Sequence, residues 1–549
     1  MPTLTDTPVR FRLALKHASR TSNPAFTCRR CLHNQPRQPP APTSSSRSSN
    51  SSSSSRTWDS FPSRRQTPFL TAFKTPDRLF LRAQSSSATT APSPLGALSQ
   101  TIGQSSSART ANATSSSSSS SSSSWPNHTP RSVGYFLLLS ATSVFGIVVL
   151  GGLTRLTESG LSITEWKPVT GSFPPTTPEH WEAEFALYRQ SPEFKMLNSR
   201  MGLEEFKEIY WMEWGHRLWG RFVGVSFLLP TLYFVARKRV DKRMAGRLLG
   251  ICGLIGFQGF IGWWMVKSGL KDELLETGSQ PRVSQYRLAA HLGTAFIAYL
   301  SMVYNGALIL RENRFLQDPH AALSRLQTLR STPLTPFRRS VAALAALTFL
   351  TAMSGALVAG LDAGLVYNDF PWMGHPNIIP PRRELLDPFY SHQQNRREGG
   401  AVPEDDMGDL LWRNMCENPV TAQLDHRILA TTTFCAVLSL FAYSRLSPRL
   451  RTLLPRDARK AVLGTVHLVS LQVALGISTL WYLVPTPVAA AHQAGALALL
   501  TGVFVLGSRV WVPGRTWRLV QRAVRESSLG SKVKSEGRKM VGSSGSSSQ

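Results

Sequence analysis

Two similar stretches of sequence decide the predicted fold of this chain of 549 residues. The chain reads GGLTRLTESGLSITEWKP over 151–168 and GALVAGLDAGLVYNDFP over 355–371, an offset of 204 residues. Each stretch follows an apolar run that is long enough to cross a bilayer as a helix. We therefore interpret the chain as two related units of one membrane protein, which excludes an ordinary soluble globular protein.

Eight apolar runs surround this repeat, and we predict a transmembrane helix for each. They cover Val133–Leu153, 216–236, Leu248–Val266, Leu288–Leu310, Val341–Leu361, 426–443, Ala461–Val484 and 487–508. Since four spans return the chain to the side on which it began, the two units must run parallel. The predicted fold class is an all-α membrane protein. Its eight transmembrane helices form two parallel-repeat four-helix bundles, related by a pseudo-two-fold axis along the membrane normal.

The first 130 residues have the composition of a mitochondrial presequence followed by a disordered Ser-rich region. They hold 15 Lys and Arg against three acidic residues, and they include a run of serines over 115–124. Segments rich in Arg and Ser and poor in acids are typical of transit peptides, and such tracts cannot bury enough apolar surface to fold. Cys28 and Cys31 form a CxxC without a second ligand pair, so we interpret them as unpaired cysteines rather than a zinc or redox site.

The charges of the loops predict how the chain crosses the membrane. Loops after the second, fourth and sixth spans hold 18 Lys and Arg against four acids, whereas the opposite loops hold 17 against 24. Basic loops stay on the inner side, so we expect a multi-pass protein of the mitochondrial inner membrane with both termini in the matrix. The net charge of +28 lies in the leader and in short loops rather than on one folded face, which argues against a nucleic-acid partner.

These patterns divide the chain into five predicted parts. Residues 1–130 form the presequence and disordered region, and 131–310 form the N-terminal four-helix unit. A matrix linker over 311–340 leads to the C-terminal four-helix unit at 341–509. The tail at 510–549 is basic and then disordered, and its basic part is expected to lie along the matrix surface.

Four histidines occupy matching positions near the start of the even-numbered spans. Span 2 opens with EWGHR and span 6 with QLDHR, which contain His216 and His426; spans 4 and 8 open with AAHLG and AAHQAG, which contain His291 and His492. Ionisable residues are costly inside a membrane, so these are functional candidates. A facing pair of imidazoles from adjacent helices of a bundle suits axial ligation of haem iron, and two pairs imply two haems.

Other interpretations of these residues remain open. One alternative is that each histidine is structural and merely caps a helix or bonds to a neighbouring one. The other is a divalent-metal site, which would use carboxylates or cysteines as ligands besides the histidines. Gly220 and Gly224, on the helix face of His216, would admit a flat macrocycle or simply allow close helix packing. His467 has no counterpart in span 3, so we interpret it as a satisfied polar residue rather than a ligand.

The two units differ next to their first histidine. Glu213 lies one turn before His216 on the same helix face, whereas the matching position in the second unit is Gln423. A carboxylate at this depth is either solvated at the bilayer edge or the proton donor or acceptor for a reaction. The asymmetry suggests one reactive haem and one that relays electrons. Three arginines are candidate contacts for haem propionates, with interfacial snorkelling as the alternative: Arg155, Arg217 and Arg427.

Four stretches of this chain resemble the haem A synthases of mitochondria and related bacteria. They are GGLTRLTESGLSITEWKPVTGSFPP from 151, EWGHRLWGR around His216, NDFPWMG over 368–374 and ENPVTAQLDHRILA around His426. The resemblance runs from Tyr135 to Ser508. It implies an inner-membrane oxidoreductase that converts the C8 methyl group of haem O into the formyl group of haem A, for the assembly of cytochrome c oxidase.

The resemblance also implies roles for the matching residues. His216 and His291 would bracket the substrate haem O, Glu213 matches the family's functional glutamate, and His426 with His492 would ligate a haem b cofactor. The implied reaction is two successive hydroxylations of the methyl group, which give a geminal diol that loses water to leave an aldehyde.

The implied partners follow from the same resemblance. They are the inner-membrane lipid, haem O synthase (a farnesyltransferase) as the source of substrate, and ferredoxin with its reductase as electron donors. An external donor is required because the sequence has no flavin or nicotinamide fingerprint. The sequence leaves open whether the protein forms a homo-oligomer.

The chain departs from the compact family pattern in the loop before span 6. Residues 381–416 include the polar stretch SHQQNRREGGAVPEDDMGD, which we interpret as an insertion. Long surface insertions cost little closure entropy, so we expect a mobile loop, with a docking role as the alternative. The loop cysteine pair of some bacterial relatives is missing from 154–217, and Cys416 has no partner in the intermembrane loops.

Two other function classes remain in view. A bis-histidine dihaem membrane cytochrome that acts only in electron transfer would use the same four histidines but would not need Glu213. A haem or small-molecule transporter would need a continuous polar path, which ligands gathered at one membrane face do not indicate.

Overall fold

A computed structural model describes residues 125–275, 281–391 and 408–543, the last eleven of these by backbone alone. Residues 1–124 of the predicted presequence and disordered region, with Cys28 and Cys31, lie outside the described residues. So do the middle of the predicted insertion, 392–407, and the last six residues of the tail.

Every regular element in the described residues is a helix, and eight helices are long and apolar enough to cross a membrane. The predicted all-α class and the predicted number of spans are therefore confirmed. The eight helices are α2 (Arg131–Leu156), α5 (Leu203–Ala236), α6 (Lys242–Gly269), α7 (Gln285–Phe315), α9 (Thr335–Gly360), α13 (Pro419–Leu446), α15 (Arg456–Trp481) and α16 (Thr486–Val510). Short 3-10 turns lie at Thr170–Ser172, Asp272–Leu275, Thr332–Leu334, Ala363–Leu365 and Pro388–Tyr390.

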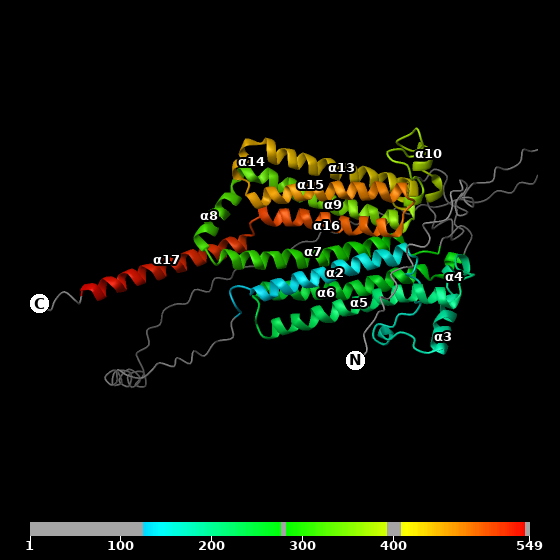
Figure 1. Ribbon diagram of the computed structural model, residues 1–549, viewed down its shortest axis with the longest axis horizontal. Coiled ribbons are helices and arrows are strands. Elements are labelled where there is room, and N and C mark those ends of the chain that lie inside the picture. The colour runs from blue at the N-terminus through cyan, green and yellow to red at the C-terminus, as the bar shows by residue number, and fades with distance from the viewer. Residues whose placement is uncertain (1–124, 276–280, 392–407, 544–549) are drawn as a thin grey trace, which may run out of the picture. The chain divides into compact units, whose positions relative to one another are not determined.

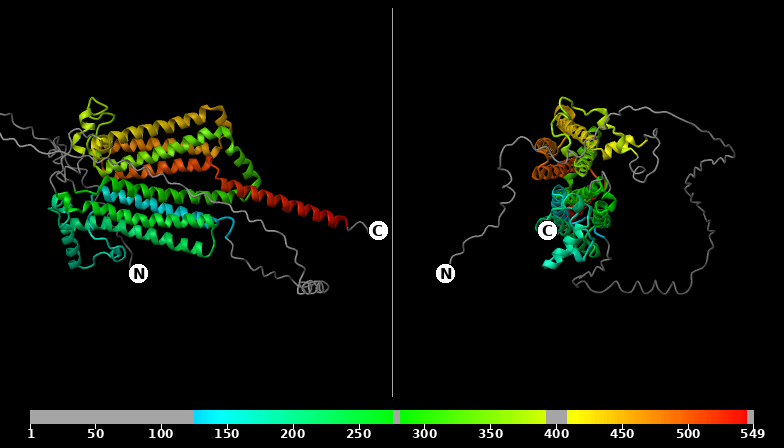
Figure 2. Two further views of the ribbon diagram at one scale, coloured as in Figure 1. Left: turned by 180° about the vertical axis from the view of Figure 1, so that it is seen from behind. Right: turned by 90° about the vertical axis from the view of Figure 1, so that its right-hand side faces the viewer.

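The long helices pack in two groups of four (Figure 1). In the first group α5 contacts α2 and α6, and α7 also contacts α2 and α6, so α5 and α7 occupy opposite corners. In the second group α13 and α16 each contact α9 and α15. The groups meet where α7 contacts α9 and α16, and where α16 contacts α2, as the view from behind in Figure 2 also shows.

Each group buries its own apolar core and exposes apolar side chains on its outside. Leu137, Phe227 and Met302 are fully or almost fully buried in the first core, and Phe337 and Val503 in the second. Outward positions are equally apolar, since Leu139 is 74% exposed and many neighbouring side chains are similar. A surface of this kind suits contact with lipid tails rather than water.

Helix α5 begins thirteen residues earlier than the span predicted from residue 216. His216 therefore lies well inside α5, so the prediction that it lies near the start of its helix was wrong. A search for apolar runs misses this extension because it contains four charged residues, Glu204, Glu205, Lys207 and Glu208. Its apolar face, with Phe206 and Tyr210, packs on α3 (Pro178–Arg189) and α4 (Pro192–Met196), two short helices within a segment that we predicted as a loop.

The described flanks of the predicted insertion are structured rather than mobile. They contain α10 (Arg382–Leu385) and α12 (Leu410–Glu417). The buried Asn414 side chain accepts from the backbone N–H of Asp387 and donates to its carbonyl. On the start of α7, Gln285 donates to the carbonyl of Cys416. These flanks therefore hold the two groups of helices together at the end where α3, α4 and α10 lie (Figure 1). Cys416 is a free, buried thiol.

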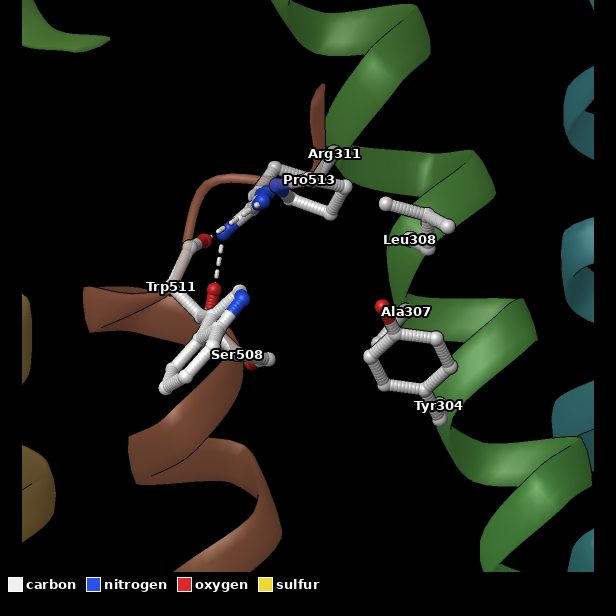
Figure 3. Close-up of a pocket in the computed structure, with 7 residues that line it drawn as sticks. All are labelled: Tyr304, Ala307, Leu308, Arg311, Ser508, Trp511 and Pro513. Carbon is white, nitrogen blue, oxygen red and sulfur yellow. Dashed lines mark hydrogen bonds between the residues drawn. The ribbon is translucent and has the colours of Figure 1, made fainter. Parts of the chain in front are cut away.

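The opposite end of the bundle carries α8 (Pro319–Arg330), α14 (Pro448–Leu453) and α17 (Gly514–Ser543). The segments predicted as a linker and as a disordered tail are thus largely helical. Their helices pack together because Leu326 of α8 and Val520 of α17 bury each other. Nearby, Arg311 of α7 donates to the carbonyls of Ser508 and Trp511, which closes one side of a small pocket between α7 and α16 (Figure 3).

Asp241 joins several segments at this end of the bundle through hydrogen bonds. It caps α6 by accepting from the backbone N–H groups of Arg243 and Met244. It also accepts from Thr129 at 2.8 Å and from both terminal nitrogens of Arg515 on α17, at 2.9 and 2.7 Å. One carboxylate therefore joins the entry of α2, the start of α6 and the start of α17.

We predict that Asp241→Ala destabilises the chain by about 3 kcal/mol, because it removes a helix cap and leaves the half-buried Arg515 without its counter-ion. Thermal unfolding of the detergent-solubilised protein and limited proteolysis of α17 would measure the effect. Asp457→Ala is the control, since its pair with Arg325 is 4.0 Å long with both side chains exposed and contributes little. Equal stability of the two variants would contradict the role of Asp241.

Candidate functional site

Each of the four predicted histidine ligands rests on a glycine of a neighbouring helix. A Cβ added to Gly151 would lie 2.9 Å from Cε1 of His216, and one added to Gly355 would lie 3.0 Å from Cε1 of His426. The same holds for Gly262 against His291 at 3.2 Å and for Gly476 against His492 at 2.9 Å. Distances this short are tighter than nearly all Cβ contacts, so a side chain at any of these glycines would press on the ring and push it away from the helix backbone.

The sequence did contain the signal for these glycine seats. Gly151 and Gly355 open the two repeated stretches, yet we singled out Gly220 and Gly224 instead. A Cβ at Gly220 would meet Ile147 at 3.6 Å, and one at Gly224 would meet Ile255 at 4.0 Å. These are ordinary packing distances, so neither glycine seats a histidine ring.

The imidazoles of each pair come from helices at opposite corners of their group, not from adjacent helices as we predicted. His216 lies on α5 and His291 on α7, whereas His426 lies on α13 and His492 on α16. The rings of His426 and His492 face each other across the second group with centroids 6.4 Å apart and planes at 88°. All four imidazoles are half-buried.

Glu213 is buried, at 2% exposure, beside His216 on α5. Its carboxylate accepts from the Ser162 hydroxyl at 2.7 Å and from the backbone N–H of Ile163 at 2.8 Å. Arg217 donates to the other oxygen from Nε and Nη2, at 3.0 and 2.7 Å. Donors on both oxygens stabilise the ionised carboxylate and fix its position.

The second unit keeps the arginine of this arrangement but not the carboxylate. Arg217 Nη2 donates to the carbonyl of Ile163 at 2.7 Å, and Arg427 Nη2 donates to the carbonyl of Tyr367, 204 residues later, at 2.8 Å. Gln423 donates to that same carbonyl at 2.9 Å. The first unit therefore has a buried carboxylate at this position, whereas the second unit has the neutral amide of Gln423.

Arg155 forms an ion pair that joins the two groups of helices. Its Nη2 lies 2.7 Å from Oδ1 of Asp362, which follows α9, and Arg282 lies 3.1 Å from Oδ2 of the same carboxylate. The Nε atoms of Arg155 and of Arg427 are buried with no hydrogen-bond partner among the described residues. These two arginines therefore keep one donor each, whereas Nε, Nη1 and Nη2 of Arg217 all have acceptors.

Comparison with known proteins identifies the family to which this chain belongs. A model of the COX15-CtaA family, described as cytochrome oxidase assembly protein, matches residues 134–504. The chain is 48% identical to the haem A synthase COX15 of Saccharomyces cerevisiae over 75% of this chain and 82% of that one. The chain belongs to the haem A synthase family. It is an oxidoreductase that converts haem O into haem A.

Two further haem A synthases extend the comparison. The human COX15 protein is 45% identical over 68% of this chain and 82% of its own length. A haem A synthase–mitochondrial ferredoxin fusion protein of Schizosaccharomyces pombe is 47% identical over 69% of this chain and 60% of its own length.

The second histidine pair has the spacing that would suit ligation of haem iron. Two imidazoles that bind one metal ion from opposite sides, each about 2 Å from it through a ring nitrogen, have centroids roughly 6 Å apart. The spacing of His426 and His492 agrees with this value. The part of the chain that the structure describes holds no group of three or more His, Cys, Asp or Glu side chains arranged to bind a metal ion. His467 is exposed on α15 and is not a candidate ligand.

A second buried carboxyl group lies near Glu213 and was not found from the sequence. Glu193 of α4 is 5% exposed, and it accepts a hydrogen bond from the Tyr188 hydroxyl at 3.2 Å. Burial raises the pKa of Glu193 to about 8, although this hydrogen bond opposes the shift, and the nearby Glu158 and Glu213 add to it. Glu193 is thus largely protonated at neutral pH, within the α3–α4 segment that covers the start of α5.

We predict that α3 and α4 loosen as the pH rises. Between the ordinary pKa of 4.5 and about 8 the folded segment binds more protons than the unfolded one, so its stability falls through this window. Hydrogen exchange of these helices, corrected for its intrinsic pH dependence, should accelerate by up to about tenfold per pH unit. Glu193→Gln should abolish this dependence, and Glu182→Gln, at an exposed site on α3, should leave it intact. Identical pH profiles for all three proteins would refute the prediction.

Proposed function

We propose that this haem A synthase oxidises the C8 methyl group of haem O to a formyl group by successive hydroxylations. The substrate haem lies between His216 and His291 in the N-terminal unit, and a haem b cofactor lies between His426 and His492 in the C-terminal unit. The single observation that carries the assignment is the buried Glu213 beside His216, with Gln423 at the matching place. Glu213 puts a buried carboxylate one turn before His216, whereas the matching position before His426 holds the neutral amide of Gln423.

Each part of the chain has a distinct task in this scheme. The glycine-seated histidines orient the two haems, and the bound haem b supplies a one-electron relay to the substrate site. Glu213 holds or releases a proton at its carboxylate, and Arg217 keeps that carboxylate in place through two hydrogen bonds. Arg155 and Arg427, each with a free Nε donor, are the arginines best suited to contact haem propionates. Arg217 is the least suited of the three predicted contacts because its nitrogens are committed.

We also propose that the two units are parallel repeats related by a pseudo-two-fold axis along the membrane normal. In such a repeat α2 corresponds to α9, and α7 corresponds to α16. The α7–α9 contact should then have a counterpart between α16 and α2, and both contacts are present. Glu158 and Asp362, 204 residues apart, both have left-handed backbones, with φ of 53° and 52°. Both repeated stretches thus turn in the same way at the same position.

The inner mitochondrial membrane is the proposed location, with residues 1–130 as presequence and both termini in the matrix. The histidines then face the intermembrane-space side, and the basic end with α8, α14 and α17 faces the matrix. Ferredoxin, reduced by its reductase, is the proposed electron donor, and the relative that is fused to a mitochondrial ferredoxin supports this. Haem O reaches the site from haem O synthase through the surrounding lipid.

We predict that Glu213→Gln binds both haems but makes at least about 100-fold less haem A, because the proton group of the reaction is lost. The haems of the purified proteins would be extracted and identified by chromatography and mass. Wild type should carry haem b with haem O, a hydroxylated intermediate or haem A, and His426→Met should lose haem b selectively.

Glu204→Gln is the matched control on the same helix, because its side chain is 84% exposed. Normal haem A production by Glu213→Gln would contradict the role of Glu213. Haem b alone in both sites of the wild type would instead favour the alternative function, a bis-histidine dihaem cytochrome.

The glycine seats give a separate prediction for each site. Gly355→Ala should displace the His426 ring and reduce haem b content, whereas Gly151→Ala should displace the His216 ring and reduce bound haem O, each by about tenfold or more, the cost typical of disturbing a ligand's support. Gly253→Ala on α6 is the control, since its Cβ would meet nothing within 4 Å. Haem contents that all match the wild type would show that the rings do not need these seats.

A further inference from the structure

The Nδ1 atoms of the histidines have different surroundings in the two units. In the second unit, Nδ1 of His426 lies 2.8 Å from the Ser354 hydroxyl of α9. That hydroxyl donates its own proton to the carbonyl of Thr351, also at 2.8 Å. A hydroxyl has one proton, so towards His426 it acts as an acceptor. Nδ1 therefore carries the ring proton, and Nε2 keeps its lone pair for iron.

The first unit has no such acceptor. The offset of 204 residues that pairs Gly151 with Gly355 places Leu150 where the second unit has Ser354. Nδ1 of His216 and Nδ1 of His291 are both buried and have no hydrogen-bond partner among the described residues. The first pair of imidazoles is thus seated on glycine but not locked by a hydrogen bond.

The second histidine of each pair differs in another way, because its partner in the second unit is an amide donor rather than a hydroxyl acceptor. Gln472 of α15 donates to the carbonyl of His492 at 2.8 Å and places the same amide nitrogen 3.1 Å from Nδ1 of the ring. Its counterpart Gln258 donates to the carbonyl of His291 and to the Thr294 hydroxyl. An amide nitrogen only donates, so this contact does not hold a proton on Nδ1 of His492. The second unit has Gly495 where the first has Thr294, and a Cβ at Gly495 would collide with the Gln472 amide. Gly495 therefore makes the room that lets Gln472 reach its histidine.

We propose that Ser354 is a positioning residue that locks His426 as a permanent ligand, and that Leu150 at the matching place leaves the first site able to exchange its haem. A substrate haem must leave as product, whereas a cofactor haem must stay. An acceptor on Nδ1–H fixes the ring and raises its basicity, which favours the ferric state and slows ligand loss. This inference rests on the proposed placement of haem b at His426 and His492.

The test compares Ser354→Ala with Ser354→Thr, which keeps a hydroxyl, and with Leu150→Ser, which introduces one in the first unit. The full-length proteins would be purified with their haems. The midpoint potential of haem b, its low-spin electron paramagnetic resonance signal and the rate of haem transfer to apomyoglobin would be measured.

Ser354→Ala should raise the haem b potential, shift its resonance signal and speed haem b loss by about tenfold, and Ser354→Thr should restore all three. Leu150→Ser should slow haem loss from the first site and leave the haem b potential unchanged. An unchanged potential and loss rate in Ser354→Ala would overturn the proposal, as would an equal shift in the Ala and Thr variants, which indicates packing alone.

The variant His426→Met separates this inference from the assignment of the sites. If His426→Met retains haem b with an unaltered resonance signal, the placement of haem b is wrong and the role of Ser354 fails with it. If His426→Met loses haem b while Ser354→Ala behaves as wild type, the placement holds and only the positioning role is refuted.

Discussion

The contact between an imidazole ring and a glycine backbone is the constraint on which the site depends. Four rings lie on four glycines, and each contact joins two neighbouring helices at one height in the bundle. Contact with the glycine fixes the direction from which each ring enters the interior of its four-helix group. The same contacts therefore set the spacing of the helices, the orientation of the histidines and the distance between facing rings. The closed groups of four helices supply the matching corners from which two rings can meet.

Chemical difference is then built onto this shared frame by a few side chains. A carboxylate lies beside one histidine pair, and the Ser354 hydroxyl faces Nδ1 of His426 in the other. The bridge from Arg155 and Arg282 to Asp362 ties the two groups of helices together on the side of the histidines. The two histidine pairs therefore share their glycine contacts but differ in the polar groups beside the rings.

Much of this was predictable because apolar runs and repeated motifs are local properties of a sequence. The eight spans needed no tertiary information, and the repeat alone singled out the four histidines that remain the predicted ligands. The N-terminal extension of α5 was missed because one of its faces is charged. Helix α17 was missed because its buried apolar residues, Trp517 and Val520, are too few to form an apolar run. Ser354 carried no signal of its own, since the repeat drew attention to residues that match rather than to a pair that differs.

The network around Asp241 also bears on how the chain is assembled in the membrane. It connects Thr129, just ahead of the first membrane-spanning helix, with Arg515, just beyond the eighth. The bonds to Arg515 can form only after all eight spans have been synthesised. A nascent chain that ends before Arg515 therefore leaves Asp241 without this partner.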